Sequence, residues 1–160
     1  MYLVDGYNLL HAPRAPWGVS ARRPLPRAIR LLISGIQDFC ARKNTEALVV
    51  FDGNPPPDPP DSTPSVRIRF TGKERSADDL LAELAARTGE RTAPKTVIVS
   101  SDRTVAASAR SQMCRALTSE AFMRLMTVKN AAGKETVRSG RDHALSDREV
   151  DAWLKKFGYA

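Results

Sequence analysis

Short apolar runs alternate with longer segments of helical periodicity along most of this chain. Runs at 2–4, 48–51 and 97–99 are entirely apolar, as in strands buried on both faces, and Cys114 to Leu117 indicates a short fifth strand. At 66–70 apolar residues alternate with arginines, which predicts a strand with one solvent-facing side. The pattern therefore predicts five short strands.

Between these runs, apolar residues recur at spacings of three and four. This spacing predicts helices over 28–40, from Ser76 to Ala85, over about 103–112 and over 119–126. Six of the eleven prolines fall between Pro55 and Pro64, which indicates a stiff loop there, and residues 12–26 are also expected to be loop. Strands that alternate with helices predict an α/β sandwich around a mostly parallel sheet.

The last fifth of the chain, from residue 129, differs from the rest in its pattern of polar and apolar residues. Residues 129–145 are polar and predict a linker that follows a domain over 1–128. Residues 146–158 carry a helix signature, with a capping box at Ser146 and Glu149 and an apolar face that includes Trp153. We expect this C-terminal helix to dock on its own domain rather than on a partner, and nothing in the sequence indicates the oligomeric state.

Composition narrows the class of protein. Lysine and arginine total 25 against 18 acidic residues, a net charge of +7, which favours a polyanionic partner such as nucleic acid or serves solubility alone. Trp17 lies in an arginine-rich stretch, where it either stacks on a base or anchors the loop on the core. The second role is preferred.

Localisation is expected to be cytoplasmic. The longest apolar run, Ala47 to Phe51, is too short to span a membrane, and Asp5 interrupts the stretch that a signal peptide would need. The two cysteines, Cys40 and Cys114, have no CxxC spacing, which excludes a zinc cluster or a disulfide scaffold and fits a reducing compartment.

Acidic residues follow the predicted strands at their carboxyl ends. Asp5, Asp52 and Asp102 each come directly after an apolar run, and Asp78 and Asp79 start the helix after the third strand. Parallel strands bring such ends to one edge of the sheet, where crowded carboxylates repel one another unless a cation neutralises them. Mg²⁺ or Mn²⁺ prefers oxygen ligands, so these residues together predict a metal site.

Each acid also has a structural explanation. Asp5 and Asp52 can open Asp-Gly turns, Asp102 can cap a helix, and Asp78 can complement a helix dipole. For Asp79 the capping box with Ser76 is the preferred role. The sequence has no dinucleotide-binding or P-loop glycine motif, and two histidines are too few for a histidine-rich zinc site.

At these residues the chain resembles the NYN domains of the PIN-like nuclease superfamily, and most closely their YacP-like branch. The resemblance rests on Tyr2 to Asn8 (YLVDGYN), Val49 to Gly53 (VVFDG), Ser76 to Asp79 (SADD) and Val99 to Asp102 (VSSD). It covers about residues 1–128. One departure is that Arg103 to Ala106 lacks the glutamine expected a few residues after the last motif. Another is that Glu83 is the one later carboxylate of the helix that carries Asp78.

The resemblance implies a three-layer α/β/α fold and a metal-dependent ribonuclease. The carried-over metal ligands are Asp5, Asp78 and Asp102, with Asp52 lining the same pocket as a further catalytic residue. Asn8 would hold the first aspartate or a metal-bound water, and Ser101 would contact phosphate or support a ligand. The resemblance also implies messenger or structured RNA as substrate, in a setting linked to translation and the ribosome.

A nuclease of this kind would cut within RNA by in-line attack of a water molecule on a phosphodiester. Backbone phosphates would be gripped by basic residues that need not read sequence, namely Arg14, Arg22, Arg23, Lys73 and Arg75. Two alternatives remain open at this stage. One is an inactive RNA-binding module of the same fold, and the other is a receiver-like signalling domain with an Mg²⁺-binding acidic pocket.

Overall fold

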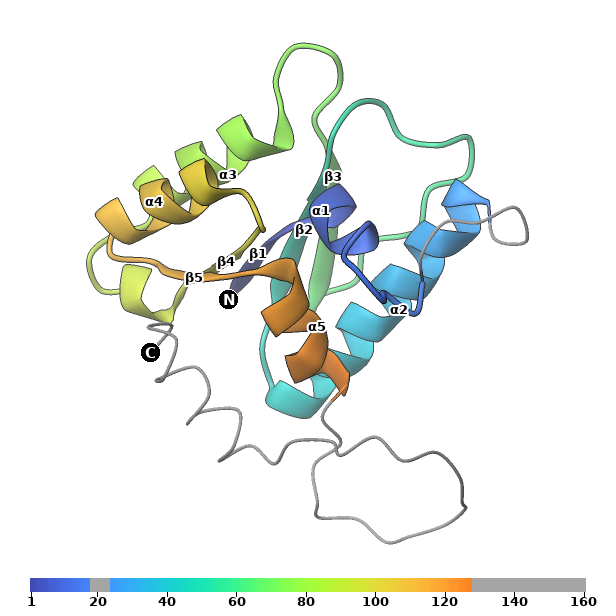
Figure 1. Ribbon diagram of the computed structural model, residues 1–160, viewed down its shortest axis with the longest axis horizontal. Coiled ribbons are helices and arrows are strands. Elements are labelled where there is room, and N and C mark those ends of the chain that lie inside the picture. The colour runs from blue at the N-terminus through green and yellow to red at the C-terminus, as the bar shows by residue number, and fades with distance from the viewer. Residues whose placement is uncertain (18–23, 128–160) are drawn as a thin grey trace, which may run out of the picture.

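A five-stranded sheet with all strands parallel forms the centre of the molecule (Figure 1). The structure is a computed structural model that describes residues 1–17 and 24–127. The spatial order is β3-β2-β1-β4-β5, and all five predicted strands are present. Their bounds are β1 Tyr2–Asp5, β2 Ala47–Phe51, β3 Val66–Phe70, β4 Val97–Val99 and β5 Arg115–Leu117.

The four helices predicted for this part of the chain are also present. They are α2 Leu25–Lys43, α3 Ala77–Ala86, α4 Arg103–Ser111 and α5 Ser119–Thr127, and a 3₁₀ turn, η1, covers Ala93–Lys95. One expectation was wrong. Instead of a simple Asp-Gly turn after β1, the chain enters a short helix, α1 Gly6–Leu10, because the Asp5 side chain accepts a hydrogen bond from the Asn8 amide and caps it.

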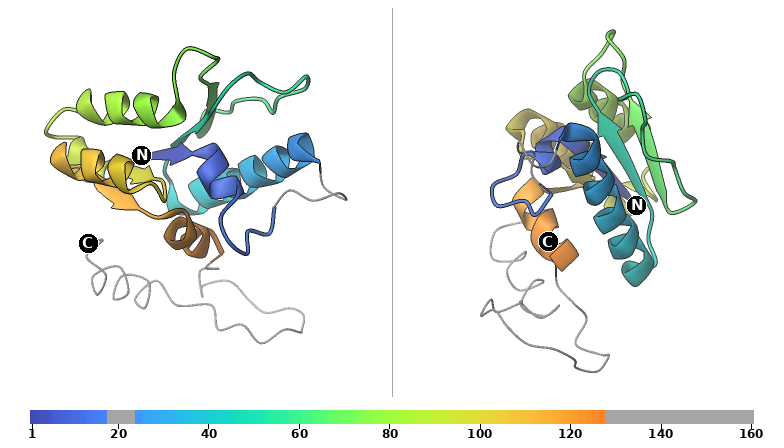
Figure 2. Two further views of the ribbon diagram at one scale, coloured as in Figure 1. Left: turned by 45° about the horizontal axis from the view of Figure 1, so that its top comes forward. Right: turned by 90° about the vertical axis from the view of Figure 1, so that its right-hand side faces the viewer.

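Helices cover both faces of the sheet, which confirms the three-layer α/β/α sandwich. On one face α2 and α5 pack on Val4, Val49 and Val99. On the other face α3 and α4 lie side by side over Leu3 and Ile98 (Figures 1 and 2). Alternation along each strand sends successive side chains into the two layers, so both faces of the central strands are apolar.

The connection from β2 to β3 has no helix. The segment over residues 52–65 contains six prolines, which lack the amide hydrogen that a helix needs. It runs as an irregular loop between the parallel strands β2 and β3. Gly53 and Gly72, both with positive φ, meet in an isolated bridge where this loop leaves β2 and the chain leaves β3. The predicted loop is confirmed.

The strand order argues against the receiver-like alternative. Receiver domains have the flavodoxin-like order 2-1-3-4-5, whereas this sheet has the order 3-2-1-4-5, which matches five strands of the Rossmann order 3-2-1-4-5-6. Both cysteines are buried and free. No helix in the described residues is long and apolar enough to cross a membrane. The predicted linker over 129–145 and helix over 146–158 lie outside the described residues.

Gly6 is where α1 packs against the aromatic side chain of Phe51 at the end of β2. A Cβ atom built at Gly6 would lie 2.4 Å from Cε1 of Phe51, and the Phe51 ring is completely buried. The ring is also fixed by edge contact with Tyr7 and by stacking on Phe70. Glycine is therefore required here for close approach, and the helix start cannot tolerate a larger residue without displacing the ring.

We expect the substitution Gly6→Ala to lower the free energy of unfolding by about 1–3 kcal/mol, because the added methyl group overpacks a rigid core position. Urea unfolding followed by circular dichroism measures this change. Gly89→Ala is the matched control, since a Cβ there meets no atom within 4 Å. Equal stability of the two variants would contradict the argument.

Candidate active site

Four carboxylates gather at the edge of the sheet where the strands end. Asp5 is the last residue of β1, Asp52 follows β2, and Asp102 lies between β4 and α4. Asp78 lies in the first turn of α3. Their charges act on one another: Asp78 and Asp52 each raise the pKa of Asp5, and Asp102 and Asp52 each raise that of Asp78. The predicted convergence of these residues is therefore present.

Asp5 is the most buried of the four, with 7% of its surface exposed. Burial raises the pKa of its carboxyl group to about 6, and the neighbouring Asp78 and Asp52 add to this rise. Hydrogen bonds from Asn8 act in the opposite direction, including one of 2.9 Å from the Asn8 amide to Oδ1 of Asp5. Asp5 thus caps α1, while its ionised carboxylate lowers the stability of the folded state.

Asp78 has an oxygen with no partner. Its Oδ1 atom is buried and accepts no hydrogen bond from any described residue. Burial, followed by the charges of Asp102, Asp52 and Asp79, raises the pKa of this carboxyl group. A buried carboxylate oxygen without a donor is unfavourable, and either a proton or a cation would relieve it. This atom is the strongest local indication of a ligand.

Asp102 is electrostatically different. It caps α4 by accepting hydrogen bonds at Oδ1 from the amides of Thr104 (2.6 Å) and Val105 (3.1 Å). These bonds hold the pKa of Asp102 below its usual range, so this residue stays ionised. The structural role considered for it is present, and the Thr104 side chain also bonds this carboxylate and adds to the lowering of its pKa.

Asp52 and Asp79 join elements to one another. Oδ1 of Asp52 accepts a hydrogen bond of 2.6 Å from the amide of Ala77 and so ties the end of β2 to the start of α3. Asp79 completes a capping box, in which its carboxylate accepts from the Ser76 amide and its own amide donates to the Ser76 hydroxyl. The preferred capping role of Asp79 is confirmed.

Asn8 connects the ends of three strands. Its side-chain oxygen accepts from the amide of Ser101 after β4 (3.2 Å) and lies 3.4 Å from the hydroxyl of Ser119 after β5. Its amide holds Asp5 at the end of β1. Ser119 is completely buried, whereas Ser101 is exposed, so the network runs from the interior to the surface. The backbone amide of Asn8 holds Asp5, and the predicted role of its side-chain amide at the site stays a prediction.

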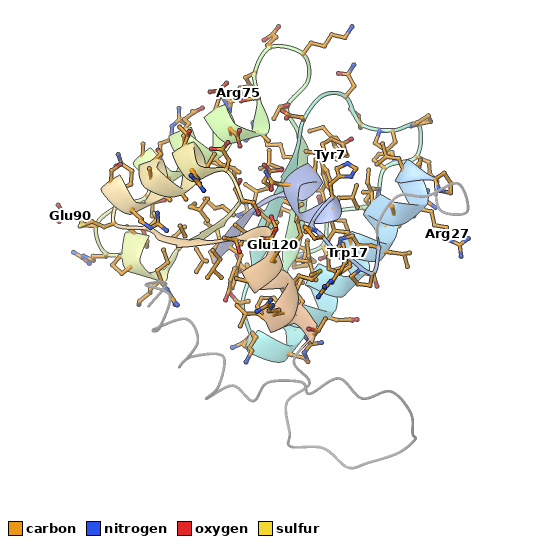
Figure 3. All side chains as sticks on the ribbon, in the orientation of Figure 1. Tyr7, Trp17, Arg27, Arg75, Glu90 and Glu120 are labelled. Carbon is orange, nitrogen blue, oxygen red and sulfur yellow. The ribbon has the colours of Figure 1, made fainter. Side chains whose placement is uncertain are left out.

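Glu120 is a site residue that the sequence analysis missed. It lies in the first turn of α5, and its Oε2 atom accepts a hydrogen bond of 3.2 Å from the Ser101 hydroxyl. Figure 3 shows it at the end of α5 that faces α1. The sequence did contain a signal for Glu120. Like Asp78 after β3, it is an acidic residue in the first turn of the helix that follows a strand.

A cavity of about 420 Å³ opens between α3 and α4 beside this edge. Its lining includes Asp78, Asp79 and Asp102, together with Ser76, Thr104 and Ser108. Asp5 and Asp52 are not among the lining residues. The open space next to the carboxylates is thus bounded by the first turns of two helices that meet at the site.

Comparison with known proteins agrees with this architecture. The sequence matches the YacP-like NYN domain family over residues 2–157. The chain belongs to this family. The match continues past residue 128, so it includes the predicted linker and nearly all of the predicted final helix. NYN domains are nuclease-like, and a cluster of carboxylates at the sheet edge is compatible with such a domain.

Solved structures show the same fold. The chain resembles the crystal structure of Rae1 (YacP) from Bacillus subtilis, with 23% identity and a TM-score of 0.61 over 79% of this chain and 72% of that one. A mutant of Rae1 also has 23% identity, with a TM-score of 0.63 over 78% of this chain and 72% of the other. No curated protein sequence matches the chain.

The donor set of this NYN domain fits a hard divalent cation in chemistry, since every candidate ligand is an oxygen and Oδ1 of Asp78 has no partner. Within residues 1–17 and 24–127, however, no three acidic, histidine or cysteine side chains lie close enough to hold one ion. The predicted trio of Asp5, Asp78 and Asp102 therefore stays a prediction. An ion held by one or two carboxylates, water and substrate oxygens suits Mg²⁺.

The predicted RNA contacts are dispersed. Arg14 is exposed in the loop after α1, and Lys73 is exposed in the loop before α3. Arg75, which lies at the start of α3 in Figure 3, donates to Glu83 at 2.7 Å, so its charge is partly neutralised. Arg22 and Arg23 lie outside the described residues. Trp17 is buried and donates its indole N–H to the Leu9 carbonyl, which confirms its role as a loop anchor.

We expect Asp5→Asn to stabilise the fold at pH 8 in EDTA by up to about 3 kcal/mol, because an ionised carboxyl group with a folded pKa of about 6 and an ordinary value of 3.8 opposes folding. Asparagine keeps the cap acceptor. The wild-type protein should regain this difference as the pH falls from about 7 to 4. Chemical unfolding across this pH range measures it.

Asp102→Asn is the control of opposite sign. Because the pKa of Asp102 is lowered in the folded state, its ionised form stabilises the fold above the ordinary value of 3.8, and that contribution is lost as the pH falls further. If the difference in stability between Asp5→Asn and the wild-type protein did not change with pH, the pKa of Asp5 would not be raised by folding, which would contradict the argument.

Proposed function

We propose that this NYN domain is a metal-dependent ribonuclease that hydrolyses RNA phosphodiester bonds within the chain. The observation that carries the proposal is the buried, unpartnered Oδ1 of Asp78 among carboxylates that raise one another's pKa. Such an arrangement is unfavourable by itself and becomes favourable when a divalent cation is bound. Membership of a nuclease-like family and a net charge of +7 support RNA as the substrate.

Asp5, Asp78 and Asp102 would hold Mg²⁺ or Mn²⁺. A bound ion of this kind polarises the scissile phosphate and lowers the pKa of a bound water. Asp102 stays ionised because the α4 amides stabilise its charge, while Asp5 and Asp78 supply charge that is not otherwise compensated. Water attacks phosphorus, the bond from phosphorus to the leaving oxygen breaks, and that oxygen takes up a proton.

The remaining residues would position these groups. Asn8 holds Asp5 through its amide and fixes the loop after β4 through its side-chain oxygen. Asp52 fixes the start of α3, which carries Asp78. Arg14 and Lys73, with Arg22 and Arg23, would contact the RNA backbone, a role that depends on charge and not on base sequence. The cytoplasm, and an RNA engaged in translation, would be the setting.

One observation favours a second candidate function. In the described part of the chain no three potential ligands are assembled around one point. A site that stays unassembled when metal and RNA are present would leave an RNA-binding module without turnover, whose affinity depends on salt and not on metal.

The test uses the full chain with a mixture of structured and single-stranded RNA in Mn²⁺, Mg²⁺ or EDTA. We expect cleavage in either metal and none in EDTA, with internal products on gels. Asp78→Asn and Asp5→Asn should each reduce the rate by at least about 100-fold. Loss of a residue that only hydrogen-bonds a metal ligand already lowers activity by up to about 100-fold, and loss of the ligand itself should lower it at least as much.

Asp61→Asn is the matched control, since Asp61 is an exposed acid in the proline-rich loop and the same charge is removed. It should cut RNA at the wild-type rate. Binding of RNA without cleavage in any metal would reject the nuclease and support the second candidate.

A further inference from the structure

A second, narrower cavity lies on the other side of Asp102, between α4 and the end of β5. Its volume is about 200 Å³. The polar residues that line it are Ser100, Ser101, Asp102, Arg103, Arg110 and Thr118. Asp102 lines this cavity and also the larger one beside Asp78, so the two open spaces are neighbours that share one carboxylate.

Two arginines dominate one wall of this cavity. Arg103 and Arg110 are seven residues apart on α4, about two helical turns, and so lie on the same face of the helix. Ala106 lies between them and leaves room for a ligand. Both arginines are exposed, and neither pairs with a carboxylate of the residues that the structure describes. The wall therefore carries two positive charges without an acidic partner among residues 1–17 and 24–127.

Three residues with hydroxyl groups, Ser100, Ser101 and Thr118, also line the cavity. The Thr118 hydroxyl oxygen accepts from the Ala121 amide at 3.1 Å, which leaves its hydrogen available to donate outward. The negative charge of Asp102 is offset at Oδ1 by the amides of Thr104 and Val105. Two guanidinium groups and a hydroxyl donor on a small cavity are the donor set that recognises a phosphate group.

We infer that this cavity binds a backbone phosphate of single-stranded RNA next to the phosphodiester that is cleaved. The inference rests on the proposed function for the identity of the ligand, and on Arg103, Arg110 and Thr118 for its position. Because Asp102 lines both cavities, a strand whose scissile phosphate lies at the carboxylates would extend over α4 into this one. The subsite would hold RNA without taking part in bond breaking.

The test is binding of a fluorescein-labelled single-stranded oligouridylate to the full chain in EDTA, where no turnover is expected, by fluorescence anisotropy over a range of KCl concentrations. The Arg103→Ala/Arg110→Ala variant should bind more weakly. The slope of log affinity against log salt should fall by about 0.7, the change for one lost phosphate contact on a single strand. Alanine favours helix, so α4 should persist, and thermal unfolding checks this.

The control removes the same charge from the opposite end of the sheet. Arg91 and Lys95 are exposed beside η1, which leads into the start of β4, and Arg91→Ala/Lys95→Ala should change the salt slope by less than half as much. If the two double variants lose the same slope, general charge explains the binding and the subsite is wrong.

Cleavage in Mn²⁺ separates this inference from the proposed function. If the arginine variant loses the predicted slope in EDTA but the wild-type chain never cuts RNA, the subsite stands and the nuclease fails. If the wild-type chain cuts RNA, the arginine variant should have a raised KM with kcat within about threefold, because a contact present before and during the reaction affects binding alone. An unchanged KM would overturn the subsite.

Discussion

Repulsion among carboxylates at one edge of the sheet is the constraint on which the site depends. A parallel sheet brings the ends of β1, β2 and β4 together, and each end carries an aspartate. Burial of Asp5 and the unpartnered oxygen of Asp78 show that the fold does not relieve this repulsion by itself. The apolar layers on both faces of the sheet hold the edge in place in spite of this cost.

The same aspartates also build the local structure. Asp5 caps α1, Asp102 caps α4, and Asp52 accepts from the first amide of α3. Capping satisfies helix amides that would otherwise lack partners, and it fixes each carboxylate relative to its helix. The structural and chemical explanations for these acids are thus compatible. Each of these amide bonds ends on Oδ1, so one oxygen of each carboxylate serves the cap.

The fold could be predicted because its strands and long helices follow from the periodicity of apolar residues, and the position of the site follows from parallel strands that end in aspartate. The rest depends on tertiary contacts. Helix α1 has five residues and depends on the packing of Gly6 against Phe51, which no local pattern shows. Ser119 contacts Asn8, which lies 111 residues earlier, and Arg110 lies beside β5. Both placements depend on how the helices pack on the sheet.

The hydrogen bonds of Asn8 have a consequence for how the site can move. One amide side chain and its backbone N–H link the ends of β1, β4 and β5, and the bond to β5 comes from the buried Ser119. Opening one strand end would break bonds at the other two, which favours a rigid edge. For the proposed nuclease, conformational adaptation would then fall to the RNA, and an unpaired, pliable segment would follow this edge where a stiff duplex would not.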